Sequence, residues 1–176
     1  MKQSKTLEKF FGLVKDQFAY GGKKYAHSGK KESTDVLFDD FGKNWLFGTI
    51  AKYVKRYSNL ARERDLLKIA CYMFILWLKR GFHVKPEKGT LEPINTTVDV
   101  KDKYFDTFIA KILETEITPA EDSLTRVYEL LLGFANKLFI RVTEEELYEV
   151  FVNVYALWDK DIKNKGTDLD TWNEEK

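Results

Sequence analysis

The sequence has little cysteine, histidine or proline, and each scarcity excludes a class of protein. Its 176 residues include one cysteine, Cys71, and two histidines, His27 and His83. An internal disulfide is therefore excluded, and a Cys/His zinc site has too few ligands. Three prolines and ten glycines leave long stretches free to be helical. Hydrophobic residues make up 44% of the chain, which is typical of a folded globular protein.

Long hydrophobic runs are also missing. The most apolar stretch, residues 69–78, is too short to cross a bilayer. The N-terminal segment, residues 1–18, is amphipathic and interrupted by charges, so it lacks the continuous apolar centre of a signal peptide. Together with the single cysteine, these features predict a cytoplasmic protein that does not interact with a membrane.

Charge is unevenly distributed, although the net charge is only +1. Residues 43–88 carry a net charge of +8, and residues 101–176 carry a net charge of −7. This asymmetry predicts either an anionic partner for the first half or attraction between the two halves, within one chain or between subunits.

Hydrophobic periodicity predicts an all-α fold of about six helices. We expect a basic N-terminal helical domain (1–82) packed with an acidic C-terminal helical subdomain (101–165). A linker (83–100) that contains two prolines joins them, and a flexible polar tail (166–176) follows. The expected helices cover residues 4–19, 35–41, 44–57, 62–80, 103–114, 118–138 and 143–163.

Glycines and capping residues mark the expected helix ends. The glycine pair 21–22 should weaken or end the first helix, Gly42 should interrupt the chain, and Gly81 falls where a C-cap glycine belongs. Thr118 and Thr143 are each followed three residues later by glutamate, a capping-box pattern that predicts a helix start.

The helical pair at residues 44–80 is the most distinctive feature, because its cations are clustered. Lys52 and Arg56 lie four residues apart and share a helix face. Clustered cations repel one another unless an anion lies among them, and phosphate is such an anion. A solvated face, or salt bridges to the acidic half, explains them equally well. The candidates for nucleic-acid binding are Lys52, Lys55, Arg56, Arg62 and Arg64.

Two further patterns are candidates for chemistry. In residues 20–25 (YGGKKY) two glycines allow close backbone approach and two lysines could hold phosphate, although an ordinary helix end followed by a turn is the simpler interpretation. Glu145, Glu146 and Glu149 form an EExxE pattern suited to Mg²⁺, but the dipole at a helix start also favours acids. The other acidic candidates are Asp39, Asp40, Glu63 and Asp65.

Four short motifs follow one another within residues 7–80. They are YGGKKY, then Asn44-Trp45, then Lys52-Tyr53 with Arg56, then the helix segment 65–72 (DLLKIACY). Their order resembles small phage-type helical domains, the dATP/dGTP diphosphohydrolase-like and MazG-like groups. The resemblance implies an all-α pyrophosphohydrolase-like fold that acts on a nucleoside triphosphate with Mg²⁺ and often forms oligomers.

The resemblance also implies roles for individual residues. Asp65 and Glu63 would be catalytic, and Asp39, Asp40 and Asp65 would hold the metal. Lys68 departs from the pattern, because it stands one turn from Asp65 where a metal site needs a second acid. The residues implied to bind the nucleotide and its phosphates are Lys23, Lys24, Tyr25, Asn44, Trp45, Lys52 and Arg56.

Three functions are compatible with these patterns. The leading hypothesis is a dNTP-binding protein related to MazG-like pyrophosphohydrolases which, if it is an enzyme, hydrolyses dNTP to dNMP and pyrophosphate. One alternative is a non-enzymatic helical nucleic-acid-binding module of phage or mobile-element origin. Another is a homo-oligomeric structural protein in which the basic and acidic halves of neighbouring subunits meet.

Overall fold

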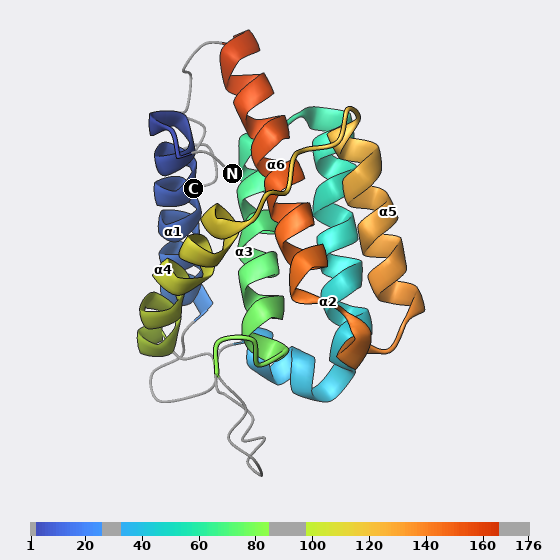
Figure 1. The fold of residues 1–176 in the computed structure, drawn as a ribbon. Helices are drawn as coiled ribbons and strands as arrows, with labels where there is room; N and C mark the ends of the chain where they lie inside the picture. The colour runs from blue at the N-terminus through green and yellow to red at the C-terminus, as the bar shows by residue number, and fades with distance from the viewer. Residues whose placement is uncertain (1–2, 26–32, 85–97, 166–176) are drawn as a thin grey trace.

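The fold is all-α, as the periodicity predicts. The computed structural model describes residues 3–25, 33–84 and 98–165, with the backbone alone for 22–25, 33–36, 98–103 and 162–165. No strand occurs in these residues, and none of their helices has an apolar stretch long enough to cross a membrane. The helices are α1 (Lys5–Tyr25), α2 (Ser33–Leu60), α3 (Glu63–Lys79), α4 (Val98–Glu114), α5 (Ser123–Asn136) and α6 (Glu144–Lys165), with a 3-10 turn η1 (Phe139–Arg141) before α6 (Figure 1).

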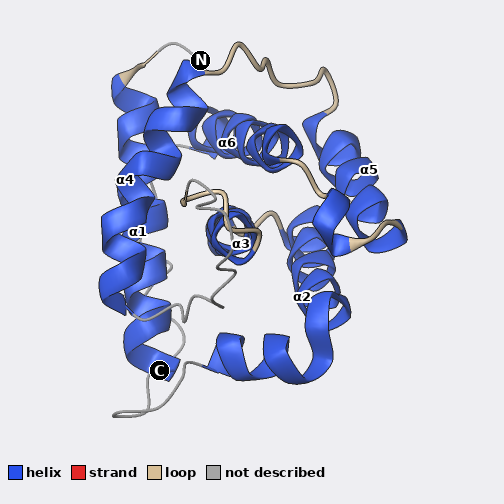
Figure 2. Cartoon of the chain, turned by 60° about the horizontal axis from the view of Figure 1, so that its bottom comes forward, coloured by secondary structure: helices blue, strands red, loops and turns tan. Residues whose placement is uncertain are grey.

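Helix α3 is the centre of the bundle. Figure 2 shows it surrounded by the other helices, and α1, α2 and α6 make its main contacts. Twelve of its 17 residues are buried. This position explains the wide apolar face that the sequence shows here, since a helix with neighbours on most sides needs apolar side chains on most sides. One continuous hydrophobic core includes residues from all six helices.

Several helix ends form as the local sequence predicts. Gly42 has φ 64° and ψ −156°, a conformation nearly restricted to glycine, and it bends α2 so that its first part lies across one end of the bundle (Figure 1). Gly81, with φ 75°, ends α3 through hydrogen bonds from the Gly81 and Phe82 amides to the Leu78 and Trp77 carbonyls. The capping box at Thr143 is also confirmed.

Two expected helix ends are wrong. The glycine pair 21–22 does not end α1, which continues to Tyr25, so residues 23–25 form helical backbone rather than a loop. The pattern at Thr118 does not start α5. The helix begins at Ser123 with Asp122 as its N-cap, and the Ala120 amide before it donates to Asn153 Oδ1 on α6 at 2.9 Å. This contact with α6 thus holds Ala120, a residue that the local pattern assigned to the first turn of the helix.

The expected linker and tail are mostly outside the described residues, which exclude 85–97 and 166–176. The described backbone resumes as helix at Val98, so α4 begins within the segment assigned to the linker.

Candidate anion-binding face

The site begins with the short connection between α2 and α3. Ala61 and Arg62 alone separate the two helices, and Ala61 adopts a left-handed conformation with φ 48°. Its amide donates to the Tyr57 carbonyl at 2.7 Å, which closes the end of α2. A two-residue connection makes the helices antiparallel neighbours. As a result, the last turns of α2 lie beside the first turns of α3, and Arg56 meets Asp65.

Asp65 is a buried carboxylate surrounded by cations. Its side chain is fully buried, and Arg56 Nε lies 3.6 Å from its Oδ2. Burial raises the pKa of Asp65, while the positive charges of Arg56, Lys68, Arg62 and Arg64 act in the opposite direction. Neither carboxylate oxygen has a hydrogen-bond partner among the described residues. The carboxylate therefore acts through its charge, which attracts these four cations.

Cations from both helices surround the ring of Tyr53. Lys52 Nζ lies 4.9 Å from the ring centroid, Lys68 Nζ 4.8 Å, and Arg56 Cζ 6.0 Å. The ring stacks on Tyr72 of α3, with centroids 6.0 Å apart and an interplanar angle of 25°. We call these five residues the basic–aromatic face. Cations packed on aromatic rings keep their side chains ordered and their charge near the surface.

Further cations extend this face toward the start of α3. Lys55 and Arg62 are exposed, and Arg64 lies with its guanidinium carbon 5.8 Å from the Tyr20 ring of α1. Arg62 is the N-cap of α3 and its side chain makes no capping hydrogen bond. The N-terminal end of a helix is electrostatically positive, so arginines there weaken the helix rather than stabilise it.

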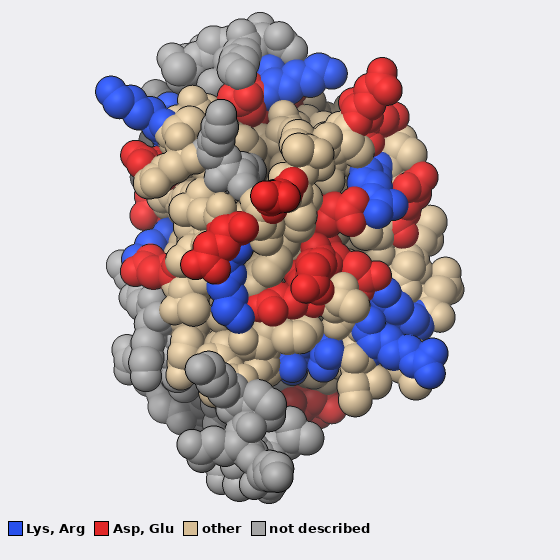
Figure 3. Space-filling view, viewed as in Figure 1, with Lys and Arg blue, Asp and Glu red and all other residues tan. Residues whose placement is uncertain are grey.

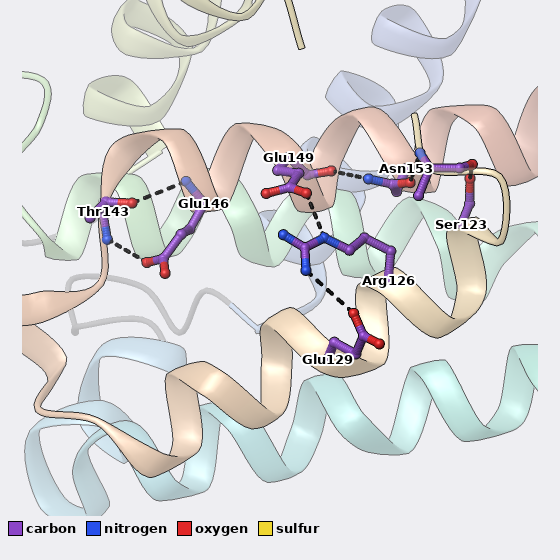
Figure 4. Close-up of polar contacts among 8 residues, drawn as sticks. Ser123, Arg126, Glu129, Thr143, Glu146, Glu149 and Asn153 are labelled. Atoms are coloured by element: carbon purple, nitrogen blue, oxygen red, sulfur yellow. Dashed lines mark hydrogen bonds and ion pairs between the residues drawn. The ribbon is translucent and has the colours of Figure 1, made fainter. Parts of the chain in front are cut away.

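The α5–α6 pair provides a contrast within the same chain. Arg126 on α5 pairs with Glu129 and with Glu149 on α6 (Figure 4). Lys137 pairs with Glu146. Glu146 also completes the capping box, because its Oε2 accepts from the Thr143 amide at 2.9 Å. Cations on this pair are matched by carboxylates. In the view of Figure 3, acidic side chains gather over α6. Glu146 thus serves the start of α6, and Glu149 serves its packing on α5.

The residues that the sequence predicts to bind a nucleotide fall into three groups. Lys52 and Arg56 lie together on the basic–aromatic face. Asn44, which is exposed, and Trp45, which is half-buried, lie two turns earlier on α2, directly after the Gly42 bend. Lys23, Lys24 and Tyr25 form the last turn of α1, for which the structure describes the backbone alone.

The carboxylates that the sequence predicts to be catalytic or metal-binding are dispersed. Glu63 Oε1 accepts a 2.7 Å hydrogen bond from Trp158 Nε1, and burial raises its pKa. Asp39 and Asp40 are exposed on the first part of α2. The described residues contain no group of three His, Cys, Asp or Glu side chains arranged to hold a metal ion. Asp65, paired with Arg56 among four cations, does not fit a Mg²⁺ ligand, because those cations repel a divalent ion.

Sequence reasoning missed the direct pairing of Arg56 with Asp65 and the stacking of Tyr53 on Tyr72. Both were within reach of the sequence, because two long helices joined by two residues must lie antiparallel. The burial of Asp65 had no sequence signal. Comparison with family models, curated proteins and solved structures finds no match to this chain, so the arrangement of its own residues is the ground for assigning a function.

Proposed function

We propose that the basic–aromatic face binds a nucleotide through its phosphates. The observation that carries the proposal is the gathering of cations on one ring, since Lys52 Nζ, Lys68 Nζ and Arg56 Cζ lie 4.9, 4.8 and 6.0 Å from the Tyr53 centroid. On the α5–α6 pair, by contrast, Arg126 and Lys137 pair directly with Glu149 and Glu146. Phosphate is an anion that such a cluster of cations attracts, and guanidinium and ammonium groups both bind it.

The aromatic pair favours a nucleotide over inorganic phosphate. Tyr53 and Tyr72 lie among the same cations that would hold phosphate. A base stacked on an aromatic side chain gains about 1–3 kcal/mol. A ligand that combines phosphates with a planar base uses both kinds of side chain, and a deoxynucleoside triphosphate is the first to test.

The proposal is for binding without a hydrolytic step. Asp65 is buried and ion-paired with Arg56, and Glu63 is engaged by Trp158, so neither presents a carboxylate to the solvent beside the cations. Asp65 is better placed to hold Arg56 in position than to activate water.

Equilibrium binding of the four dNTPs to the full chain tests the proposal. Lys52→Ala removes an exposed cation, and we expect it to weaken dNTP affinity about 10-fold, as for the loss of one charge-assisted contact. The double change Lys52→Ala/Lys68→Ala should weaken it further. Lys160→Ala, an exposed lysine on α6, is the matched control and should leave affinity unchanged. Absence of binding by all four dNTPs at millimolar concentration would contradict the proposal.

A pyrophosphate-release assay with Mg²⁺ separates binding from turnover. We expect binding without release of pyrophosphate. Turnover that is lost in both Asp65→Asn and Glu63→Gln would instead show that these carboxylates act in catalysis, which contradicts the binding-only form of the proposal.

A nucleic-acid partner is the second candidate. It is favoured by the exposure of Lys55 and Arg62, which lie beyond the basic–aromatic face and extend its charge along α2 and α3. This candidate predicts that DNA or RNA affinity falls steeply with salt, and that Lys55→Ala lowers the slope by about one unit. No gel retardation at low salt would reject it.

A further inference from the structure

Exposed apolar side chains concentrate on α5 and the segment that follows it. Tyr128, Leu132, Leu138 and Ile140 are 37, 58, 63 and 71% exposed. Tyr128 and Leu132 lie one turn apart, so they share the outward face of α5, and α5 lies at the edge of the bundle (Figures 1 and 2). We call these four residues the α5 apolar surface. Contiguous apolar side chains in this arrangement typically mark an interface.

The backbone that carries this surface is held by two cations. Arg80, at the end of α3, donates from Nη2 to the Ile140 carbonyl at 2.7 Å and from Nε to the Val142 carbonyl at 3.0 Å. Lys43 of α2 donates to the Ala135 and Lys137 carbonyls at the end of α5. The exposed side chains therefore lie on a backbone that hydrogen bonds to other helices hold in place.

Charges at the two ends of α5 have opposite signs. Its N-terminal end has the exposed acids Glu121 and Asp122, and its C-terminal end is followed by exposed Arg141. In Figure 3, acidic side chains lie at the upper end of this edge of the molecule and Lys or Arg side chains at the lower end. Antiparallel pairing of two such helices places each acidic end against the other copy's basic end.

We propose that the α5 apolar surface is a homodimer interface, in which α5 packs antiparallel on α5 of a second copy about a twofold axis. A twofold interface must be self-complementary, and an apolar middle with oppositely charged ends meets that requirement. The α5 helix alone is about 20 Å long, and η1 extends the surface further. This interface is independent of the proposed nucleotide site on α2 and α3, so either proposal can fail without the other.

Light scattering coupled to size-exclusion chromatography, over a range of protein concentrations, tests the apolar part. We expect a wild-type dimer, and a rise of about 100-fold in the dissociation constant for Leu132→Glu, because the carboxylate would be buried at the centre of the interface. Leu60→Glu is the matched control, since Leu60 is 55% exposed at the end of α2. It should leave the mass unchanged. Circular dichroism checks that each variant is folded.

A charge swap tests the antiparallel geometry. Arg141→Glu should raise the dissociation constant about 10-fold by placing like charges together, and adding Glu121→Arg in the same chain should restore it to within about 3-fold. A wild-type monomer at about 100 μM would overturn the proposal. A dimer that survives Leu132→Glu, or a double variant no tighter than Arg141→Glu, would overturn it as well.

Discussion

Trp158 Nε1, near the end of α6, donates a 2.7 Å hydrogen bond to Glu63 Oε1 in the first residue of α3. The reverse contact joins the opposite ends of the same helices, where Trp77 Nε1 donates to Glu144 Oε1, also at 2.7 Å. The two helices are antiparallel (Figure 1), and the same number of residues separates the glutamate from the tryptophan in each. In each helix, the glutamate of the first residue accepts a hydrogen bond from the tryptophan of the other helix. These two contacts fix the register of α3 against α6.

Loss of the Trp158 donor is expected to destabilise the fold. Trp158→Phe should lower the free energy of unfolding by about 2–4 kcal/mol, because it leaves a space in the core and removes the donor to the half-buried Glu63 carboxylate. In a double-mutant cycle with Glu63→Ala, which removes the acceptor, urea unfolding should give a coupling of about 1–2 kcal/mol. Trp45→Phe, at a half-buried tryptophan on α2, is the control and should cost less. Additive losses in the cycle would contradict the contact.

Glu144 should make stability fall in acid. Burial raises its pKa, but hydrogen bonds from Tyr148, Lys111 and Trp77 outweigh burial and hold the pKa below its ordinary value. A lowered pKa in the folded state contributes stability that is complete above the unfolded pKa of about 4.3 and is lost as pH falls through the folded value. Glu144→Gln should therefore lower stability at pH 7 and reduce the loss between about pH 5 and 3. Glu145→Gln, at its exposed neighbour, should change neither. Parallel pH profiles for Glu144→Gln and the wild type would disprove this role.

His83 should also lower stability as the pH falls, but at a higher pH than Glu144 does. Its ring lies between Trp77 and Tyr104, with centroids 5.8 and 4.7 Å away, and neither ring nitrogen has a hydrogen-bond partner among the described residues. Burial lowers its pKa. The unfolded chain therefore takes up a proton first as pH falls through about 6.5, and stability decreases below that pH. His83→Phe should remove this decrease. An unchanged slope in the variant would exclude His83 as its origin.

The bend in α2 depends on Gly42. Its φ of 64° and ψ of −156° are strained for any residue with a Cβ, so Gly42→Ala should cost about 2–3 kcal/mol of unfolding free energy. Gly48 lies six residues later, exposed within the same helix, and an added Cβ there meets nothing within 4 Å. Gly48→Ala should therefore stabilise by up to about 1 kcal/mol. Thermal unfolding measures both, and effects of the same sign would contradict the assignment of the bend to Gly42.

Local sequence signals succeeded where the partners are near in the chain. Thr143 and Glu146 form the expected capping box, and Gly81 ends α3 as expected. They failed where the local penalty is small or where a distant residue decides. Two glycines cost a helix only about 1 kcal/mol each, so α1 continues through 21–22. Thr118 does not start α5, because the Ala120 amide that follows it is bound by Asn153 on α6.

For the candidate site, the sequence by itself determined the excess of cations on two adjoining helices and their helical spacing, because charge and periodicity are properties of the chain. It did not determine that Asp65 is buried beside Arg56 or that Glu63 accepts a hydrogen bond from Trp158. Nor did it determine that Lys52 and Lys68 both lie against the ring of Tyr53. Those relationships arise only when α2 and α6 pack on α3. The energy that decides them is the burial of side chains from separate helices, which no local pattern encodes.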